Sequence, residues 1–291
     1  MKAKYLLDLF VMMVLLTGFC SCSDDDKEGT FYVDKSDLFL MMGNKDNIFI
    51  LPNEGNYVVK SLDEHIATGE IKQTDNGDGS ISLLSVSVTP VSKGKTTFVI
   101  SNGIEEKKVD VTVVDAYMVF DVGNQVFSSV GESDKSEVGM KELQKDPFLS
   151  MNNVFMLVKD EAHTMYLFES LDDVEIDETS RSTSQRTYKS KGSYEMVKSG
   201  DTYYMVLKSG DRFFRFEIGG NPTGQSILKS FFNLNGLKSE SSVPEYLAQV
   251  TFTEDLTEEY NNKFQGGFSF VGRDYTCTML SQRIYKLPFE E

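Results

Sequence analysis

The stretch YEMVKSGDTYYMVLKSGDRFFRFEI, residues 194–218, decides the fold of the C-terminal half of this chain. A turn of Lys, Ser, Gly and Asp occurs in it twice, at 198–201 and 208–211. Glycine beside Ser and Asp is typical of tight hairpin turns, and the runs between the turns have the length of strands. The stretch therefore predicts an antiparallel meander of three strands, Tyr194–Val197, Tyr203–Leu207 and Arg212–Ile218.

More strands are predicted on both sides of this meander. Asn153–Lys159 and Thr164–Ser170 form a predicted hairpin around Asp160-Glu161-Ala162. Near the C-terminus, Phe268–Val271 and Tyr275–Tyr285 are predicted to complete the sheet. The second half of the chain is therefore expected to be a β-rich (α+β) antiparallel-sheet domain.

Helices are expected to be few. The two candidates are Ser226–Leu234 and Glu254–Lys263, the second with Thr253 as N-cap and acidic residues in its first turn. The segment Asp177–Lys191 is rich in Ser, Thr, Arg and Lys and has no periodicity, so a mobile loop is predicted there.

The first third of the chain has short β-rich runs separated by Gly, Asn and Pro turns, which predicts a small β-sandwich. In residues 81–88, apolar residues at 84, 86 and 88 alternate with serines at 85 and 87, so one strand face is buried and the other is wet. The predicted strands are Asp37–Leu40, Ile48–Leu51, Tyr57–Lys60, Ile81–Val88, Thr96–Ile100 and Lys108–Val114.

A family resemblance accompanies this pattern. The segments Gly55–Ala67, Thr89–Ile100 and Val109–Val113 give a strand after a glycine and a Gly-x-Thr corner before the last hairpin. This order resembles the bacterial immunoglobulin-like group 2 domains of surface proteins, with a departure at the insertion Asp75–Gly79. The resemblance implies an immunoglobulin-like sandwich that acts as a spacer or adhesive module and has no shared catalytic residues.

The N-terminus has the parts of a secretory signal: Lys2 and Lys4, an apolar stretch at residues 9–19, and small residues next to a cysteine. Asp8 is a departure, since it places a charge at the edge of the apolar stretch. The stretch is too short to cross a bilayer as a helix. A cleaved targeting segment is therefore predicted, with no transmembrane anchor.

The residues around Cys20 and Cys22, LTGFCSCSDDD at 16–26, resemble the lipobox of bacterial lipoproteins followed by the acidic export tag of Bacteroidetes-type lipoproteins. The resemblance implies acylation of Cys22 and display on the outer face of the outer membrane. Cys22 is preferred over Cys20, because Ser21 is the small residue before Cys22 whereas the bulky Phe19 precedes Cys20; Thr17 and Gly18 argue weakly for Cys20. An ordinary cleaved signal before an acidic linker is the alternative. Each buried methylene of an acyl chain contributes about 0.8 kcal/mol to membrane attachment.

Removal of residues 1–21 leaves 270 residues with 27 basic and 44 acidic side chains, a formal charge of −17. Such an excess disfavours nucleic acid and anionic lipid surfaces as partners. The length predicts two domains. The expected organisation is a signal peptide at 1–21, an acidic tether at 22–30, the sandwich at 31–115 and the β-rich domain at 116–291.

Cys277 is then the only cysteine besides the lipidated one, which excludes an intrachain disulfide framework. The complete absence of tryptophan makes a sugar-stacking surface less favoured, although 13 tyrosines could serve. Stability is therefore expected to come from packing, and a glycan or a protein remains a possible extracellular ligand.

No residue is predicted to be catalytic, and no cofactor or metal is predicted. The segment Gly267–Gly272 places its second glycine one residue too late for a nucleophile elbow, so Ser269 is interpreted as structural. Cys277 could act as a nucleophile only beside His65 or His163, and buried strand cysteines usually behave as small apolar residues. The recognisable zinc signatures are absent.

Two acidic clusters are candidates for calcium, although solvation is favoured for both. Asp173, Glu175 and Asp177 are expected on one side of an extended run, and Asp75 and Asp78 are expected to share a turn. A glycosidase-type carboxylate pair is also left open, because the distances between the acids are unknown.

The sequence thus predicts an outer-membrane, surface-exposed lipoprotein with a non-catalytic binding or adhesion role, in which the sandwich lifts the second domain from the membrane. The alternatives are an extracellular hydrolase of glycan or peptide and a structural subunit of a surface assembly or fimbria. Two carboxyl groups about 5 to 9 Å apart in a deep cleft would favour the hydrolase. A shallow Tyr and Phe platform would favour binding, and an open sheet edge would favour assembly.

Overall fold

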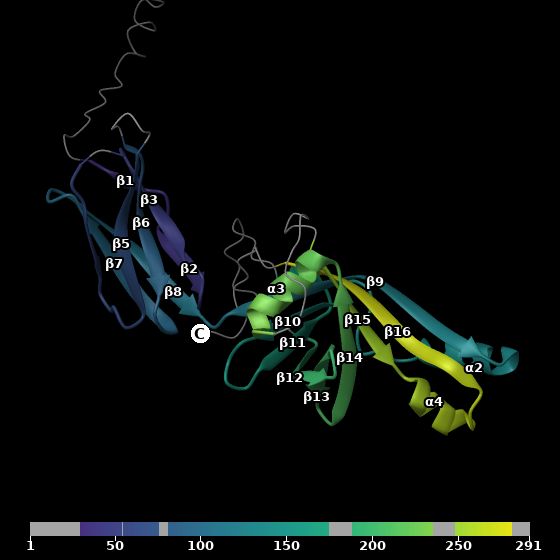
Figure 1. The fold of residues 1–291 in the computed structure, drawn as a ribbon. Helices are drawn as coiled ribbons and strands as arrows, with labels where there is room; N and C mark the ends of the chain where they lie inside the picture. Colours follow the sequence, from purple (N-terminus) through teal and green to yellow (C-terminus); the bar gives the residue numbers. More distant parts are fainter. Residues whose placement is uncertain (1–29, 54, 76–80, 175–187, 235–247, 281–291) are drawn as a thin grey trace, which may run out of the picture. The chain divides into compact units, whose positions relative to one another are not determined.

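A computed structural model of the chain describes residues 30–53, 55–75, 81–174, 188–234 and 248–280. The described part is mainly β, as the sequence predicts, with two four-stranded sheets and an eight-stranded closed barrel (Figure 1). The chain divides into two compact units, one containing most residues up to Val111 and the other made mainly of Thr112–Glu291. The predicted signal peptide and almost all of the acidic tether lie outside the described residues.

The first unit contains eight strands in two sheets, with the orders β1-β3-β6-β5 and β2-β8-β7-β4. If β1 to β8 are named A, A′, B, C, D, E, F and G in chain order, the two sheets are A-B-E-D and A′-G-F-C. These are the strand orders of immunoglobulin-like sandwiches. The strands are β1 (Tyr32–Val33), β2 (Asp37–Met41), β3 (Asp46–Leu51), β4 (Val58–Ser61), β5 (Ala67–Asp75), β6 (Ile81–Pro90), β7 (Gly94–Ser101) and β8 (Glu106–Val114). The predicted immunoglobulin-like sandwich is therefore confirmed.

One pair in the sandwich runs parallel. Asp110 N donates to Ser36 O at 3.0 Å, and Met42 N donates to Val114 O at 2.9 Å. The bonded residues advance along β2 and β8 in the same direction, which is the parallel geometry. The first strand of the unit thus changes sheets between β1 and β2.

The two sheets face each other across an apolar core. Gly69 of β5 lies so close to the other sheet that a Cβ there would be 2.3 Å from the Phe98 ring of β7. Phe98, Ile48 and Val86 are fully buried, and along their strands buried residues alternate with less buried ones. The sequence analysis missed β5 and the short β1, because β5 is an edge strand with polar side chains along much of its length.

The second unit is a meander of eight antiparallel strands that closes on itself, with β9 hydrogen-bonded to both β10 and β16. The predicted antiparallel sheet is therefore confirmed, and it closes into a barrel because the first and last strands of the unit are neighbours. The strands are β9 (Tyr117–Gly131), β10 (Val154–Val158), β11 (Thr164–Phe168), β12 (Ser190–Ser199), β13 (Thr202–Ser209), β14 (Arg212–Gly220), β15 (Gln249–Asp255) and β16 (Phe268–Met279).

The two predicted tight turns form β12, β13 and β14 into hairpins. Gly200 and Gly210 both have φ +60°, and the strand pairs Ser199 with Thr202 and Ser209 with Arg212 flank them. A two-residue hairpin loop with glycine first is the type II′ arrangement. The predicted β10–β11 hairpin is also confirmed, and both strands are buried on both faces.

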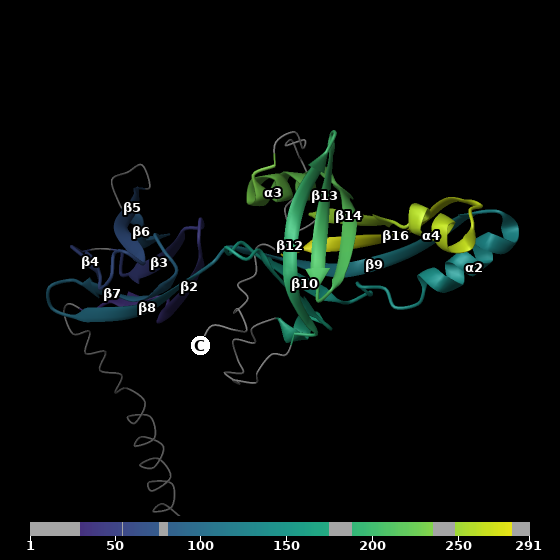
Figure 2. The ribbon, with the colours of Figure 1, turned by 90° about the horizontal axis from the view of Figure 1, so that it is seen from below.

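β9 and β16 run past the other barrel strands as a two-stranded ribbon that carries two helices at its far end (Figure 2). The helices there are α2 (Ser133–Leu143) and α4 (Thr257–Phe264), and they share a small separate core that contains Tyr260, Phe268 and Val271. A third helix, α3 (Pro222–Phe232), follows β14, and its N-cap Asn221 accepts from Gly224 N.

Several predictions about the second unit are wrong. α2 was missed, because its sequence is mostly polar and has only one buried side chain, that of Leu143, besides the buried Gly139. Thr253 is not a helix cap, since it and Glu254 belong to β15 and α4 begins at Thr257. β16 is one continuous strand to Met279, and residues 281–285 lie outside the described residues. The end of the predicted mobile loop, Ser190-Lys191, is the start of β12, and most of the rest of that loop lies outside the described residues.

Candidate functional site

The interior of the barrel is filled by side chains. Phe120 stacks on Phe155 with ring centroids 4.7 Å apart, and Phe252 meets both rings edge-on. Phe216 meets Phe252 and Tyr275 in the same way, at 6.3 and 5.8 Å. These rings belong to one buried hydrophobic core that fills the interior, as side chains do in many eight-stranded barrels.

Both ends of the barrel are covered. At one end α3 adds Leu228, Phe231 and Phe232 to the core. At the other end the connection between α2 and β10 inserts Phe148 and Leu149, and the Phe148 ring stacks on Phe214 at 4.0 Å.

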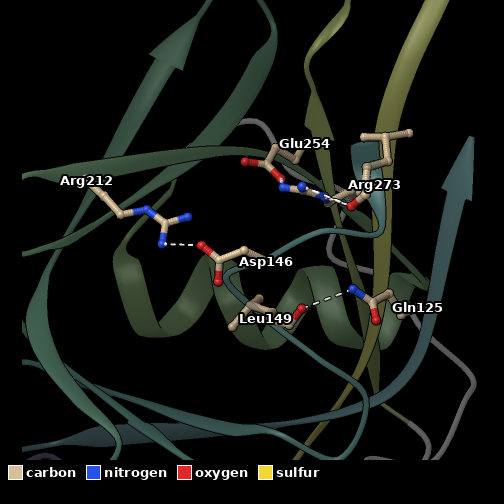
Figure 3. Close-up of polar contacts among 7 residues, drawn as sticks. Gln125, Asp146, Leu149, Arg212, Glu254 and Arg273 are labelled. Atoms are coloured by element: carbon tan, nitrogen blue, oxygen red, sulfur yellow. Dashed lines mark hydrogen bonds and ion pairs between the residues drawn. The ribbon is translucent and has the colours of Figure 1, made fainter. Parts of the chain in front are cut away.

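Polar contacts hold this second cover in place (Figure 3). Asp146 accepts from Arg212 at 3.1 Å, and Leu149 O accepts from Gln125 Nε2 at 3.0 Å. Arg273 Nε and Nη2 donate to Leu143 O at 3.1 and 3.0 Å, while Nη1 donates to Glu254 Oε2 at 2.9 Å. The connection is thus tied to β9, β14 and β16.

Glu254 and Arg273 are the buried ion pair of the barrel. They lie directly opposite each other on β15 and β16, and are 5% and 7% exposed. Burial raises the pKa of Glu254, while the guanidinium of Arg273 opposes that rise. All three nitrogens of Arg273 are used inside the protein, so the pair serves structure and leaves no group for a ligand.

The sequence-predicted nucleophile candidates are far from a catalytic arrangement. Cys277 is fully buried in the barrel core opposite Val250, and burial raises the pKa of its thiol. The His163 ring stacks on Tyr194 at 5.2 Å, and His65 belongs to the other unit. Ser269 lies in β16 and donates to Val130 O at 3.2 Å, in agreement with its interpretation as a strand residue.

Of the two acidic clusters, the structure describes only Asp173 and Asp75, and Asp173 differs from the extended run that was expected. Asp173 ends a short 3-10 helix, Leu171–Asp173, and its carboxylate accepts from Ser170 N and Oγ at 3.2 and 3.3 Å. Glu175, Asp177 and Asp78 lie outside the described residues, and Asp75 ends β5. Among the residues that the structure describes, no group of three or more His, Cys, Asp or Glu side chains could hold a metal ion.

A shallow groove of about 220 Å³ lies between α2, α4 and the start of β16. Phe264, Phe268 and Val138 form most of its lining, with Asp134 and Lys135 at the side. Lys135 Nζ is already bonded to Gly266 O at 2.8 Å. In the part of the chain that the structure covers, none of the helices has the length and hydrophobicity that a membrane span requires.

The outer face of β12, β13 and β14 carries both exposed aromatic and charged side chains. Its side chains form three cross-strand rows: Ser193, Lys208 and Phe213; Glu195, Val206 and Arg215; and Val197, Tyr204 and Glu217. We call these nine residues the β12–β14 face. Phe213 is 65% exposed, although its neighbour Phe214 is buried in the core.

Two aromatic rings of the β12–β14 face each carry a cation. Arg215 Cζ lies 3.7 Å from the centroid of the Tyr204 ring, and Lys208 Nζ lies 5.2 Å from that of Phe213. Cations over aromatic rings are attracted by the negative ring face. The sequence analysis found the strands of this face but not the site, although the alternation of inward and outward residues in 203–217 was the signal that could have found it.

The fold and this face define a two-unit β protein: an immunoglobulin-like sandwich followed by a closed eight-stranded barrel with a filled interior and an aromatic–cationic outer face. No protein family model matches the chain, and no curated protein sequence matches it.

Solved structures of an S-layer protein, SbsC, are similar to parts of the chain at low TM-scores. Its domains 4 and 5 have a TM-score of 0.25 and 29% identity, over 29% of this chain and 51% of that one. Its domains 5–6 have a TM-score of 0.26 and 18% identity, over 65% and 95%, and its domains 4–9 have 0.26 and 14%, over 84% and 49%. The chain thus spans about half the length of the first and third of these structures.

Proposed function

We propose that this chain is a lipid-anchored surface protein with a non-catalytic role. It binds an extracellular partner through the β12–β14 face of its barrel. The observation that carries the proposal is Tyr204 and Phe213 on one solvent-facing sheet, each with a cation over its ring. A sheet of paired strands holds these side chains in fixed positions, which lowers the entropy lost on binding.

The features of the barrel support binding over hydrolysis. Its interior is packed, and the buried carboxylate Glu254 is held by Arg273. The shallow aromatic surface lies instead on the outside, where Phe213 is the most exposed large apolar residue among the described residues of the second unit. Tyr, Phe and Arg are enriched in protein-binding surfaces, and the β12–β14 face contains all three.

The assembly alternative predicts an open sheet edge that can accept a donated strand. Each of the eight described barrel strands has a hydrogen-bonded neighbour on both sides, although β9 beyond Val122 pairs only with β16 and Arg212–Phe216 of β14 pairs only with β13. Edges remain in the sandwich at β1, β5, β2 and β4, of which β1 and β4 are short. We keep binding as the proposed function because the β12–β14 face combines exposed aromatic rings with cations, whereas the sandwich edges support assembly through an unpaired strand alone.

The anchor and the sandwich complete the proposal. Acylation of Cys22 would hold the chain at the outer membrane, and the immunoglobulin-like group 2 resemblance supports a spacer role for residues 31–115. The test of the anchor is fatty-acid labelling of the Cys22→Ser precursor with Cys20 intact. We expect labelling to disappear; persistent labelling would assign the lipid to Cys20.

The test of binding uses residues 23–291 on arrays of glycans and of extracellular proteins. We expect hits that are lost in the Tyr204→Ser, Phe213→Ser double variant and kept in Tyr32→Ser. Tyr32 is a matched control, because it is 64% exposed, carries Lys107 over its ring at 5.9 Å, and lies in the sandwich. Hits that persist in the double variant would refute the proposed face.

A further inference from the structure

The β12–β14 face contains two cations, Arg215 and Lys208, and two acids, Glu195 and Glu217, so its formal charge is zero. The whole sequence has 45 acidic against 29 basic side chains, yet Arg215 and Lys208 form no ion pair within the described residues. The two other described arginines both have acidic partners: Arg212 pairs with Asp146 at 3.1 Å and Arg273 with Glu254 at 2.9 Å. Although Glu195 and Glu217 lie on the same face, neither forms an ion pair with these two cations, so both cations keep donors for a carboxylate from outside.

Stacking prepares these cations for that role. A guanidinium that lies on a tyrosine ring keeps its planar edge of N–H donors directed away from the ring, and this edge matches a carboxylate. The ring also restricts the rotation of Arg215 before a ligand arrives, which lowers the entropy lost on binding.

The same stacking disfavours a sugar ring as the ligand. A sugar would need the open face of Tyr204 or Phe213, and a cation lies over each of those rings. The chain also has no tryptophan, the side chain with the largest stacking area. The ligand that fits must instead meet the cations and leave them on their rings.

The strand positions of the two cations, as distinct from their charged ends over Phe213 and Tyr204, have the spacing of an extended polypeptide. Lys208 is opposite Phe213 and Arg215 is opposite Val206, so the cations are diagonal neighbours on adjacent strands. Diagonal neighbours are about 7–8 Å apart. Alternate side chains on one face of an extended peptide are about 6.6 Å apart, which is close to that separation.

We infer that the partner is an extended acidic protein segment with Asp or Glu at two alternate positions and an apolar residue next to them. The carboxylates would meet Arg215 and Lys208, and the apolar side chain would cover Phe213. This inference rests on the proposed function, because it names the partner of the same face.

The test measures binding of residues 23–291 to three labelled ten-residue peptides by fluorescence anisotropy. In the first, Glu alternates with Thr and a Leu stands near one end. The second has the same composition with its glutamates contiguous, and the third has Gln in place of Glu. Polygalacturonate is the competing acidic glycan probe.

We expect the alternating peptide to bind best and the Gln peptide to bind at least about tenfold more weakly, since each bond to a charged group is lost. The Arg215→Gln, Lys208→Gln double variant should lose about tenfold or more of the affinity. The control variant Lys60→Gln, Lys95→Gln removes the same charge from exposed sites of the sandwich and should bind normally.

Equal binding of the alternating and contiguous peptides, insensitivity to the double variant, or tighter binding of polygalacturonate would overturn the inference. So would the absence of binding to all of the peptides. If the array hits still depend on Tyr204 and Phe213 in any of those cases, the inference fails while the proposed function stands. Loss of that dependence refutes both.

Discussion

Arg273 and Arg215 belong to the same barrel and have opposite surroundings. Arg273 is 7% exposed and uses its nitrogens on Glu254 and on the carbonyl of Leu143. Arg215 is exposed, lies on the Tyr204 ring at 3.7 Å and has no acidic partner among the described residues. We infer that Arg273 stabilises the fold, whereas Arg215 is available to bind a partner.

The largest effect is expected when the buried arginine is removed. Arg273→Leu leaves Glu254 buried without its cation and frees the connection after α2, so we expect a loss of about 3–5 kcal/mol in the free energy of unfolding. Cys277 is the only cysteine in residues 23–291 and is fully buried, so the rate of thiol labelling in urea reports barrel unfolding. A loss below about 1 kcal/mol would contradict this expectation, because it would mean that the Glu254–Arg273 pair contributes no more than an exposed salt bridge does.

A double variant sharpens this result. Arg273→Leu with Glu254→Gln buries no unpaired charge, and pairs replaced as a unit are often neutral to stability. We expect it to recover part of the loss. Failure to recover would assign the loss to the hydrogen bonds at Leu143 O instead of the charge.

The second prediction concerns pH. In Arg273→Leu the pKa of Glu254 is expected to rise further, because burial raises it already and the opposing guanidinium is gone. The folded state then keeps a proton that the unfolded chain releases near the ordinary pKa of 4.5. Stability should therefore be highest at low pH and fall as pH rises from that value through the pKa of the folded state.

The size of this fall is about 1.4 kcal/mol for each unit by which the folded pKa exceeds the unfolded one. The matched control is the double variant, in which the Glu254→Gln substitution removes the titrating carboxyl, so its difference from the single variant isolates Glu254. Parallel pH profiles of the two variants would show that Glu254 is not the titrating group.

The sequence predicts the strands that contain Arg215 and Tyr204, but it misses β15 and leaves Arg273 in a gap between two predicted strands. The hairpins of residues 194–218 can be predicted from Gly200 and Gly210, because tight turns need glycine where φ is positive. Closure of the barrel cannot be predicted from such local signals, since the pairing of β9 with β16 joins residues more than a hundred positions apart. The partner of Arg273 likewise depends on register across β15 and β16, which local patterns do not encode.

α2 and the buried glutamate show a second reason for failure. The helix has a mostly polar surface and buries little, so its periodicity is weak. Glu254 follows a threonine and precedes other acids, a pattern that indicates a helix N-terminus, but burial opposite Arg273 places it in β15. Tertiary contacts override the local preference in this segment.

The third prediction tests the exposed arginine for a structural role. Arg215→Gln removes the cation from Tyr204, and exposed cation–π contacts contribute about 0.5–1 kcal/mol. We expect the stability loss to stay below about 1 kcal/mol in the Cys277 labelling experiment. A loss as large as that of Arg273→Leu would make the two arginines equivalent and remove the reason to assign Arg215 to a partner.

The smallest effect is expected at Phe213, whose side chain is mostly in water. Phe213→Ser should change stability by no more than about 0.5 kcal/mol, as substitutions at exposed sites do. The adjacent Phe214 is the internal control, since its ring is buried against Phe148 at 4.0 Å. Phe214→Ala should cost about 3–5 kcal/mol, the usual range for a core aromatic residue. If both variants were equally stable, the alternation of inward and outward residues along β14 would be wrong, and the β12–β14 face would not present Phe213 to a partner.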